Sequence, residues 1–367
     1  MVPRKSRHTT RWAFFPLKGL DVLNKTADLD RPMFGDATIL SLAHIPSLLS
    51  LLSKSMKGSA ASDLSQTTKS ILDYVNSVEE FQSFVVVRRT ASTPAPRSQS
   101  GPLSQEQWFV SARRRACLIA SLISLVLLAR SKRGRTCGLV EHLGRSSENF
   151  FVMDFDVGTW AFQGGGGGGH MIYAREQTVR LTRAKLLAAV GAKSFRVLSS
   201  VCLLRRDKLP KSLGNSIAEA TLTLGIAVHS EMPERRLLGA VTAMEILLSD
   251  DLGRYETTER HLEILVGEKS RHSFRAKEVF RSRHAYVHRG QRISDPTLPL
   301  AATRLALLCL VRFAQCAPRF RSRTEMMDYL DMTSKTQSIS WNSEQKTGLR
   351  KLTKLSTTPL KFPFLKT

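Results

Sequence analysis

Apolar residues recur at helical spacing through the C-terminal half of the chain. Those of residues 235–249 fall on one stripe, as in an amphipathic helix: Leu237, Leu238, Val241, Met244 and Leu248. Similar patterns predict four further helices, over residues 212–227, 257–266, 273–288 and 300–315. Glycine, proline or aspartate residues separate these segments. Helices with such short connections indicate an antiparallel bundle.

The pattern in the N-terminal half is weaker and mixes both periods. Residues 37–56 predict a helix that Pro46 ends or kinks. Residues 68–87 predict a second helix that runs into a short apolar strand. Apolar and polar residues alternate over 151–157, which is typical of a half-buried strand.

Two segments have the composition of connectors. Residues 90–105 are rich in Ser, Pro, Thr and Gln and predict a linker or a disordered loop. Residues 163–170 contain six consecutive glycines, which could form a phosphate-binding loop. The Lys-Ser or Lys-Thr that closes such a loop is missing, so a flexible connector is the better interpretation.

The predicted fold class is therefore mainly α, with three regions. Residues 1–205 form a poorly defined mixed α/β region of unknown type, and residues 206–317 form the helical bundle. Residues 318–367 are basic and rich in Ser and Thr, and they predict a largely flexible tail with a short helical patch near 324–332.

Charge and cysteine content narrow the classes of partner. The chain has 55 Lys and Arg against 31 Asp and Glu, a formal net charge of +24. This surplus favours polyanions, with nucleic acid first and anionic membrane second, unless the surface is basic without a specific ligand.

The five cysteines are scattered and never form a C-x-x-C pair, which argues against a disulfide framework and a zinc site. We therefore expect a reducing, cytoplasmic location.

One apolar run resembles a membrane segment. Residues 116–129 are apolar and are flanked by arginines on both sides. A helix that crosses a bilayer needs about 20 residues, so this run better fits a buried or an interfacial helix. A membrane is therefore an unlikely partner, although peripheral binding through this run is a third possible function.

Candidate chemistry lies at the end of the predicted helix 273–288, in the stretch Arg283-His284-Ala285-Tyr286-Val287-His288-Arg289-Gly290. His284 and His288 are four residues apart and share one helix face, together with Arg281. Arg283 lies about 140° around the helix from His288, but its long side chain could reach back.

These side chains are suited to cleaving RNA without a metal or other cofactor. The C-terminus of a helix favours a protonated imidazole. An imidazole such as that of His288 can accept the proton of a ribose 2′-hydroxyl. A guanidinium can bind the scissile phosphate through two hydrogen bonds. The alternative is that these side chains only cap carbonyls or pair with acids.

The motif resembles the hallmark of the HEPN superfamily, and within it the Apea-like HEPN domains. That hallmark is an arginine, four to six residues and then a histidine, with a polar residue after the arginine. Arg283 and His288 match it, and His284 takes the polar position in place of the more usual asparagine. Arg281 also satisfies the spacing, so the assignment of the arginine is not unique.

The segment preceding the motif also matches this family. Residues 238–249 resemble the family's preceding helix, in which Glu245 would face Arg283 or His284 and orient it. Equally, Glu245 could be an ordinary, partly exposed helical glutamate. The resemblance covers residues 212–316, and the polar, acidic connection at 249–258 departs from the family pattern.

If the resemblance holds, the domain is an all-α bundle that forms a homodimer, with the two motif helices facing a shared cleft. It would cleave RNA to a 2′,3′-cyclic phosphate and a 5′-hydroxyl, and the family's roles in defence, toxicity and stress would be expected. The implied catalytic residues are Arg283, His288 and His284, with Glu245, Arg281 and Tyr286 in support. Many relatives are non-catalytic, so an RNA-binding or dimerisation module is the alternative.

Overall fold

Helices dominate the computed structural model, and they account for 71% of the described residues. The mainly α class predicted from the sequence is thus confirmed, and a smaller sheet region accompanies it. The structure describes residues 10–25, 32–54, 83–90, 105–131, 137–139, 150–154, 159–163, 178–203, 209–230, 232–249 and 255–334. The glycine run, the core of the linker at 91–104 and the helix expected from residue 68 lie outside these residues.

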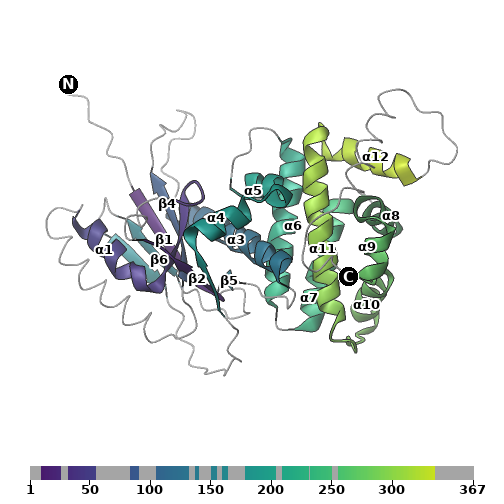
Figure 1. Cartoon of the computed structure of the whole chain (residues 1–367), viewed down its shortest axis with the longest axis horizontal. Coiled ribbons are helices and arrows are strands. Elements are labelled where there is room, and N and C mark those ends of the chain that lie inside the picture. The colour runs from purple at the N-terminus through teal and green to yellow at the C-terminus, as the bar shows by residue number, and fades with distance from the viewer. Residues whose placement is uncertain are drawn as a thin grey trace. The chain divides into compact units, whose positions relative to one another are not determined.

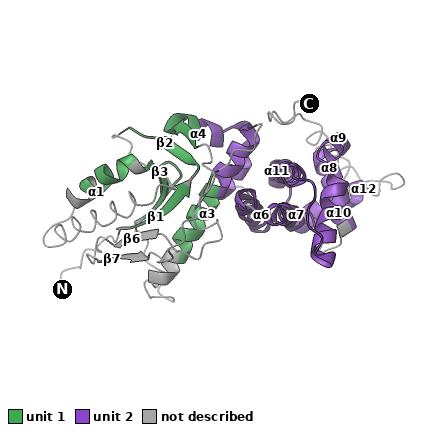
Figure 2. Cartoon of the chain, turned by 90° about the horizontal axis from the view of Figure 1, so that it is seen from below, with its two compact units in different colours: residues 1–120, 137–187 green, residues 121–136, 188–367 purple. Residues whose placement is uncertain are grey.

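The chain divides into two compact units (Figure 2). Unit 1 comprises residues 1–120 and 137–187, and unit 2 comprises residues 121–136 and 188–367. Two helices contribute to both units, α3 (Gln105–Arg130) and α4 (Arg183–Val190).

Unit 1 is built on an antiparallel sheet of six strands (Figure 1). Five strands follow the order β3-β4-β1-β6-β7, and β5 also pairs with β1. Strands β1, β3 and β4 are buried over most of their length, so they form the core of this unit. The strands are β1 (Thr10–Lys18), β3 (Ala37–Ser41), β4 (Ser83–Thr90), β5 (Gly138–Leu139), β6 (Phe150–Asp154) and β7 (Thr159–Gln163). A separate parallel pair joins β2 (Leu20–Leu23) to β8 (Val179–Thr182).

The start of the helix predicted over residues 37–56 is wrong. Residues 37–41 form strand β3, in which Ile39 pairs with Val85 of β4. Pairing with a distant strand outweighs the weak local preference of this segment. Helix α1 (Ile45–Lys54) follows a short 3-10 turn, η2 (Leu42–His44). Pro46 lies in the first turn of α1, where its missing N–H costs nothing, so it starts the helix instead of ending it.

Helix α3 contains the apolar run that resembled a membrane segment. Within 116–129 every residue except Cys117 is buried. Arg115, one of the flanking arginines, turns into unit 1, where its Nε donates to Asp36 Oδ1 at 2.9 Å and its Nη2 donates to the carbonyl of Phe34 at 2.9 Å. The Arg115 side chain therefore attaches the first part of α3 to unit 1.

Unit 2 is a group of packed helices whose centre is formed by α6 (Lys211–His229), α7 (Pro233–Leu248) and α11 (Leu298–Cys316). These three helices pack on one another, as the end-on view in Figure 2 shows. Helix α10 (Ala276–Arg289) covers α7 and α11, and α8 (Tyr255–Val266) packs on both of these helices and on α12 (Arg323–Ser334). The 3-10 turn η4 (Lys193–Phe195) and α5 (Arg196–Cys202) begin the unit's longer segment.

Helix α12 corresponds to the helical patch expected near 324–332, and it is attached to the bundle. Arg323 Nη2 donates to the carbonyl of Ser249, at the end of α7, at 2.6 Å. His261 of α8 is fully buried, and its Nδ1 donates to the carbonyl of Leu248 at 2.8 Å. Its Nε2 lies 2.9 Å from Asp331 Oδ1, so the side chain joins the end of α7 to α12. Residues 335–367 lie outside the described part of the chain.

Among the described residues, one segment is long and apolar enough to cross a membrane. This segment is Leu298–Arg319, which includes α11, and 78% of its most apolar 18-residue window is buried inside the protein.

The close contact of α6 with α7 should depend on Gly239. A Cβ at Gly239 would lie 2.5 Å from Cβ of Ala227, which is far inside normal contact. We expect Gly239→Ala to lower the free energy of unfolding by about 1–3 kcal/mol. Gly214→Ala is the matched control, since its Cβ would meet only Leu209 Cδ2 at 3.8 Å. This control should raise the free energy of unfolding by about 0.4–1 kcal/mol. Urea unfolding of both variants measures the difference, and equal effects would contradict the packing argument.

The attachment of α12 should depend on Asp331. In Asp331→Ala the buried Nε2 of His261 loses its acceptor, which should cost about 1–3 kcal/mol of stability. Asp328 is an exposed acid on the same helix, and Asp328→Ala should change stability by less than about 0.5 kcal/mol. Thermal unfolding together with hydrogen exchange in α12 tests both values. Similar losses in the two variants would show that the imidazole contact is not what matters.

Candidate functional site

The helix predicted over residues 273–288 is interrupted just after its start. Helix α9 (Glu268–Ser273) ends at Phe274, and α10 begins after Arg275. Arg275 has φ 54 and ψ 42, and within the described residues it is the one non-glycine residue with positive φ. A left-handed conformation costs a non-glycine residue about 1–2 kcal/mol, so its surroundings must stabilise it.

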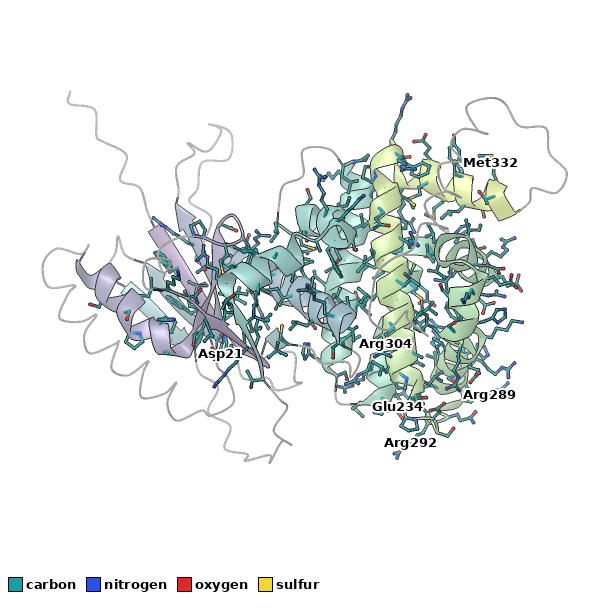
Figure 3. The ribbon with its side chains drawn as sticks, viewed as in Figure 1. Asp21, Glu234, Arg289, Arg292, Arg304 and Met332 are labelled. Carbon is teal, nitrogen blue, oxygen red and sulfur yellow. The ribbon has the colours of Figure 1, made fainter. Side chains whose placement is uncertain are left out.

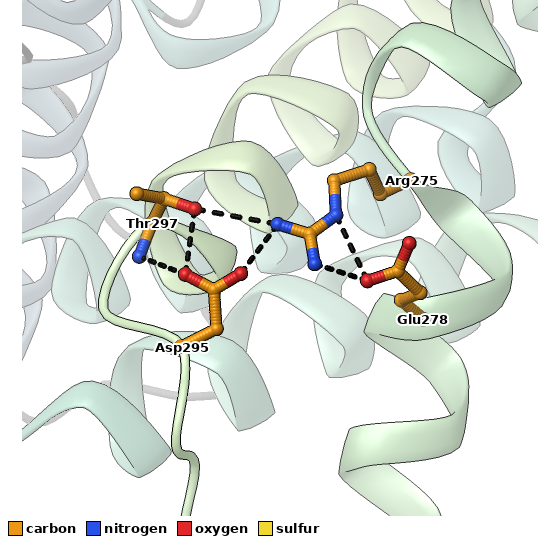
Figure 4. Close-up of polar contacts among 4 residues, drawn as sticks. All are labelled: Arg275, Glu278, Asp295 and Thr297. Carbon is orange, nitrogen blue, oxygen red and sulfur yellow. Dashed lines mark hydrogen bonds and ion pairs between the residues drawn. The ribbon is translucent and has the colours of Figure 1, made fainter.

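A polar network fixes this left-handed residue (Figure 4). The guanidinium of Arg275 donates to Glu278 in the first turn of α10 and, from Nη1, to Asp295 Oδ2 at 2.5 Å. Asp295 Oδ1 accepts hydrogen bonds from the backbone N–H of Thr297 at 2.8 Å and from its hydroxyl at 2.7 Å. The network thus joins the start of α10 to the loop that precedes α11.

The same contacts shift the acidity of both carboxyl groups. The hydrogen bonds from Thr297, with that from Arg275, lower the pKa of Asp295 to about 2. The hydrogen bond from Arg275 lowers the pKa of Glu278. Hydrogen bonds to Glu278 and Asp295 in turn raise the pKa of Arg275. All three groups are therefore charged at neutral pH, and the network is ionic.

The C-terminus of α10 is closed by its own backbone. Gly290 has φ 64, a conformation that glycine adopts without strain. Its N–H donates to the carbonyl of Tyr286 at 3.0 Å, and the N–H of Gln291 donates to the carbonyl of Ala285 at 3.3 Å. These bonds occupy carbonyls that a side-chain cap would otherwise use.

The two histidines of the motif lie together on the open face of α10. Their ring centroids are 4.4 Å apart, and the ring planes are tilted by 43°. Both His284 and His288 are exposed, as is Arg281, while Tyr286 is half-buried. The paired imidazoles are therefore accessible to a ligand from solution.

Arg283 points to a different neighbour. Its Nη2 lies 3.1 Å from Oε1 of Glu245 on α7, and the two side chains are 26% and 25% exposed. Within the described residues, Glu245 is the one polar side chain that Arg283 contacts. The structure thus brings Glu245 to Arg283, as the resemblance implied, and does not join Arg283 to either histidine directly.

Chemically, α10 offers two accessible imidazoles and, next to His284 in the sequence, an arginine that pairs with Glu245. The ion pair with Glu245 limits where the Arg283 guanidinium can lie. The histidines can accept and donate protons at a ligand bound on this face. In the described ranges, no group of three His, Cys, Asp or Glu side chains gathers as a metal site would require.

Sequence reasoning missed two contributors to this helix. Lys277 is exposed four residues before Arg281, a spacing that places both on the face of the histidines. Its spacing was visible in the sequence. The network of Arg275 and Asp295 was not visible in the sequence, because these residues are twenty positions apart and only the fold brings them together.

Comparisons with known proteins add no relative. No family model matches the chain, and neither the curated proteins nor the solved structures show a significant match.

Stability should become pH-dependent through Asp295 in the acid range. Its pKa is lowered from 3.8 to about 2, so its contacts stabilise the fold fully above pH 3.8 and lose this effect as the pH falls towards 2. Asp295→Asn should be less stable than the wild type at neutral pH, and the difference should shrink below pH 3.8. Unfolding by urea across this pH range gives the difference. A constant difference between the two proteins would contradict the assignment.

Proposed function

We propose that unit 2 is a HEPN-like domain that cleaves RNA without a metal. The proposal is supported by one observation above all: two exposed imidazoles lie 4.4 Å apart on α10, the helix that also carries Arg283, whose guanidinium pairs with Glu245. The net charge of +24 favours a polyanionic substrate. The spacing of Arg283 and His288 is that of the HEPN hallmark.

In the proposed reaction His288 accepts the proton of the ribose 2′-hydroxyl. The 2′-oxygen attacks the adjacent phosphorus, and the bond from phosphorus to the 5′-oxygen breaks. His284 donates a proton to the leaving 5′-oxygen, which yields a 2′,3′-cyclic phosphate and a 5′-hydroxyl. One imidazole must therefore be neutral and the other protonated, so the rate should fall on both the acid and the alkaline side.

Arg283 would stabilise the charge that builds up on the phosphate. A guanidinium has five N–H donors, so it can keep its contact with Glu245 and still bind a phosphate oxygen. Glu245 then acts as a positioning residue, because it fixes the guanidinium before the substrate arrives. A homodimer through unit 2, as the resemblance implies, would bring a second α10 to the site.

A non-catalytic RNA-binding module is the second candidate. The ion pair of Arg283 with Glu245 favours it, because an arginine that pairs with an acid on a neighbouring helix needs no catalytic role. In that case unit 2 would bind RNA with a marked salt dependence and leave it intact.

The role of His288 separates these candidates. We expect His288→Ala to reduce RNA cleavage by at least about a hundredfold, because a general base typically contributes 10²–10⁴ to the rate. His272→Ala on α9 is the matched control, since His272 is also an exposed helical histidine and should leave cleavage unchanged. Cleavage is measured on labelled RNA in EDTA, with the products tested for a cyclic phosphate.

Both variants should unfold at the temperature of the wild type, because the replaced side chains are exposed. Full cleavage by His288→Ala would rule out the assigned base. RNA that is bound by the wild type but never cut, with or without divalent ions, would establish the binding module instead.

A further inference from the structure

A row of four cationic or titratable side chains runs along the exposed face of α10. We call it the α10 stripe, and it consists of Lys277, Arg281, His284 and His288. Their spacings of four, three and four residues keep them on one face of a helix. All four are exposed. The stripe therefore extends the histidine pair by two further turns towards the start of α10.

The stripe keeps its positive charge because the nearby acid is paired elsewhere. Helix α10 has four lysine or arginine residues and one acid, Glu278. Glu278 is adjacent to Lys277, but its hydrogen bonds come from Arg275, and the charge of Arg281 acts on it only at longer range. Beyond the stripe, Arg289 and Arg292 lie at the end of α10 and in the loop that follows (Figure 3).

We propose that the α10 stripe is a binding track for single-stranded RNA, in which Lys277 and Arg281 contact phosphates next to the one that is cleaved. This inference rests on the proposed function. His288 lies eleven positions after Lys277, which corresponds to about 16 Å along the helix axis. That length is sufficient for several consecutive phosphates of one strand. A substrate longer than a dinucleotide then binds more tightly because it fills more of the track.

A single strand suits this surface better than a duplex. The major groove of an RNA duplex is deep and too narrow for side chains to read, so a helix with one row of cations gains little from it. A single strand can follow the row and turn its unstacked bases onto exposed rings. His284 and His288 offer such rings. The 2′-hydroxyl attack also needs a backbone that can rotate into line, which a duplex restricts.

The test measures binding to RNA that cannot be cleaved. The probe is a single-stranded oligonucleotide of about twelve nucleotides with 2′-O-methyl riboses, compared with one of about four nucleotides and with the duplex form. The variant is Lys277→Gln combined with Arg281→Gln. The control is Lys193→Gln combined with Arg196→Gln on η4 and α5, which removes the same charges from another exposed part of unit 2.

Each phosphate contact to a single strand contributes about 0.7 to the slope of log affinity against log salt. The stripe variant should therefore lose about 1.4 from this slope, and on the order of twentyfold in affinity at about 0.1 M salt. The control should keep most of the wild-type slope. The wild type should also bind the longer strand better than the shorter one, and the variant should lose most of that gain.

Binding alone decides this proposal, so its failure is distinct from that of the proposed function. If His288→Ala still cleaves RNA but the stripe variant loses affinity as expected, the track stands and the catalytic assignment falls. If the stripe variant binds like the wild type or like the control, the track is overturned even when cleavage depends on His288. Tighter binding of the duplex than of the single strand would also overturn it.

Discussion

Close packing around α7 is the constraint on which unit 2 depends. This helix contacts α6, α8, α10 and α11, so its buried face cannot rotate without disturbing all four. Gly239 allows α6 to approach so closely that a Cβ at this position of α7 would overlap Ala227 of α6. With α7 fixed in this way, its Glu245 lies against Arg283 of α10 and positions the guanidinium. The location of the guanidinium thus depends on the apolar packing that fixes α7.

The strength of the Arg283–Glu245 pair decides what it can do. A half-exposed ion pair stabilises a protein by about 0–1 kcal/mol, which is too little to account for the packing of α10. It is enough to reduce the number of positions that a long side chain visits. An incoming phosphate does not need to break it, because the guanidinium has donors left over. The histidines have no comparable restraint among the described contacts, and their exposure lets them follow a substrate.

The apolar pattern predicted the helices of unit 2 well because each helix has a face that must be buried whatever its partner is. The apolar pattern of residues 235–249 corresponds to α7, and that of residues 300–315 corresponds to α11. Residues 37–41 could not be predicted in this way, since their strand exists through pairing with Val85 and its neighbours far along the chain. The break before α10 was also hidden, because Arg275 is neither glycine nor proline, and a distant aspartate stabilises its conformation.

The candidate site was partly predictable for a similar reason. The spacing of His284 and His288 on a helix was sufficient to bring their rings together, whatever surrounds them. The direction of Arg283 was not fixed by its own helix. Its length would have let its side chain reach back to His288, but it meets Glu245 of α7, a contact that the family resemblance implied and the spacing did not. Spacing therefore predicted contacts within α10, whereas contacts between helices needed the packing of the whole unit.

The net charge of the chain does not say where on the surface a polyanion would bind. In unit 2, the ion pairs show which acids are already paired with arginines. Glu278 and Asp295 are held by Arg275, Glu245 by Arg283, and Glu263 by Arg271. Each of these acids neutralises an arginine at a helix junction or between helices. None of the four residues of the α10 stripe is an acid, and all four are exposed. A polyanion that approaches this face would therefore meet two cations, Lys277 and Arg281, in the same row as the two imidazoles.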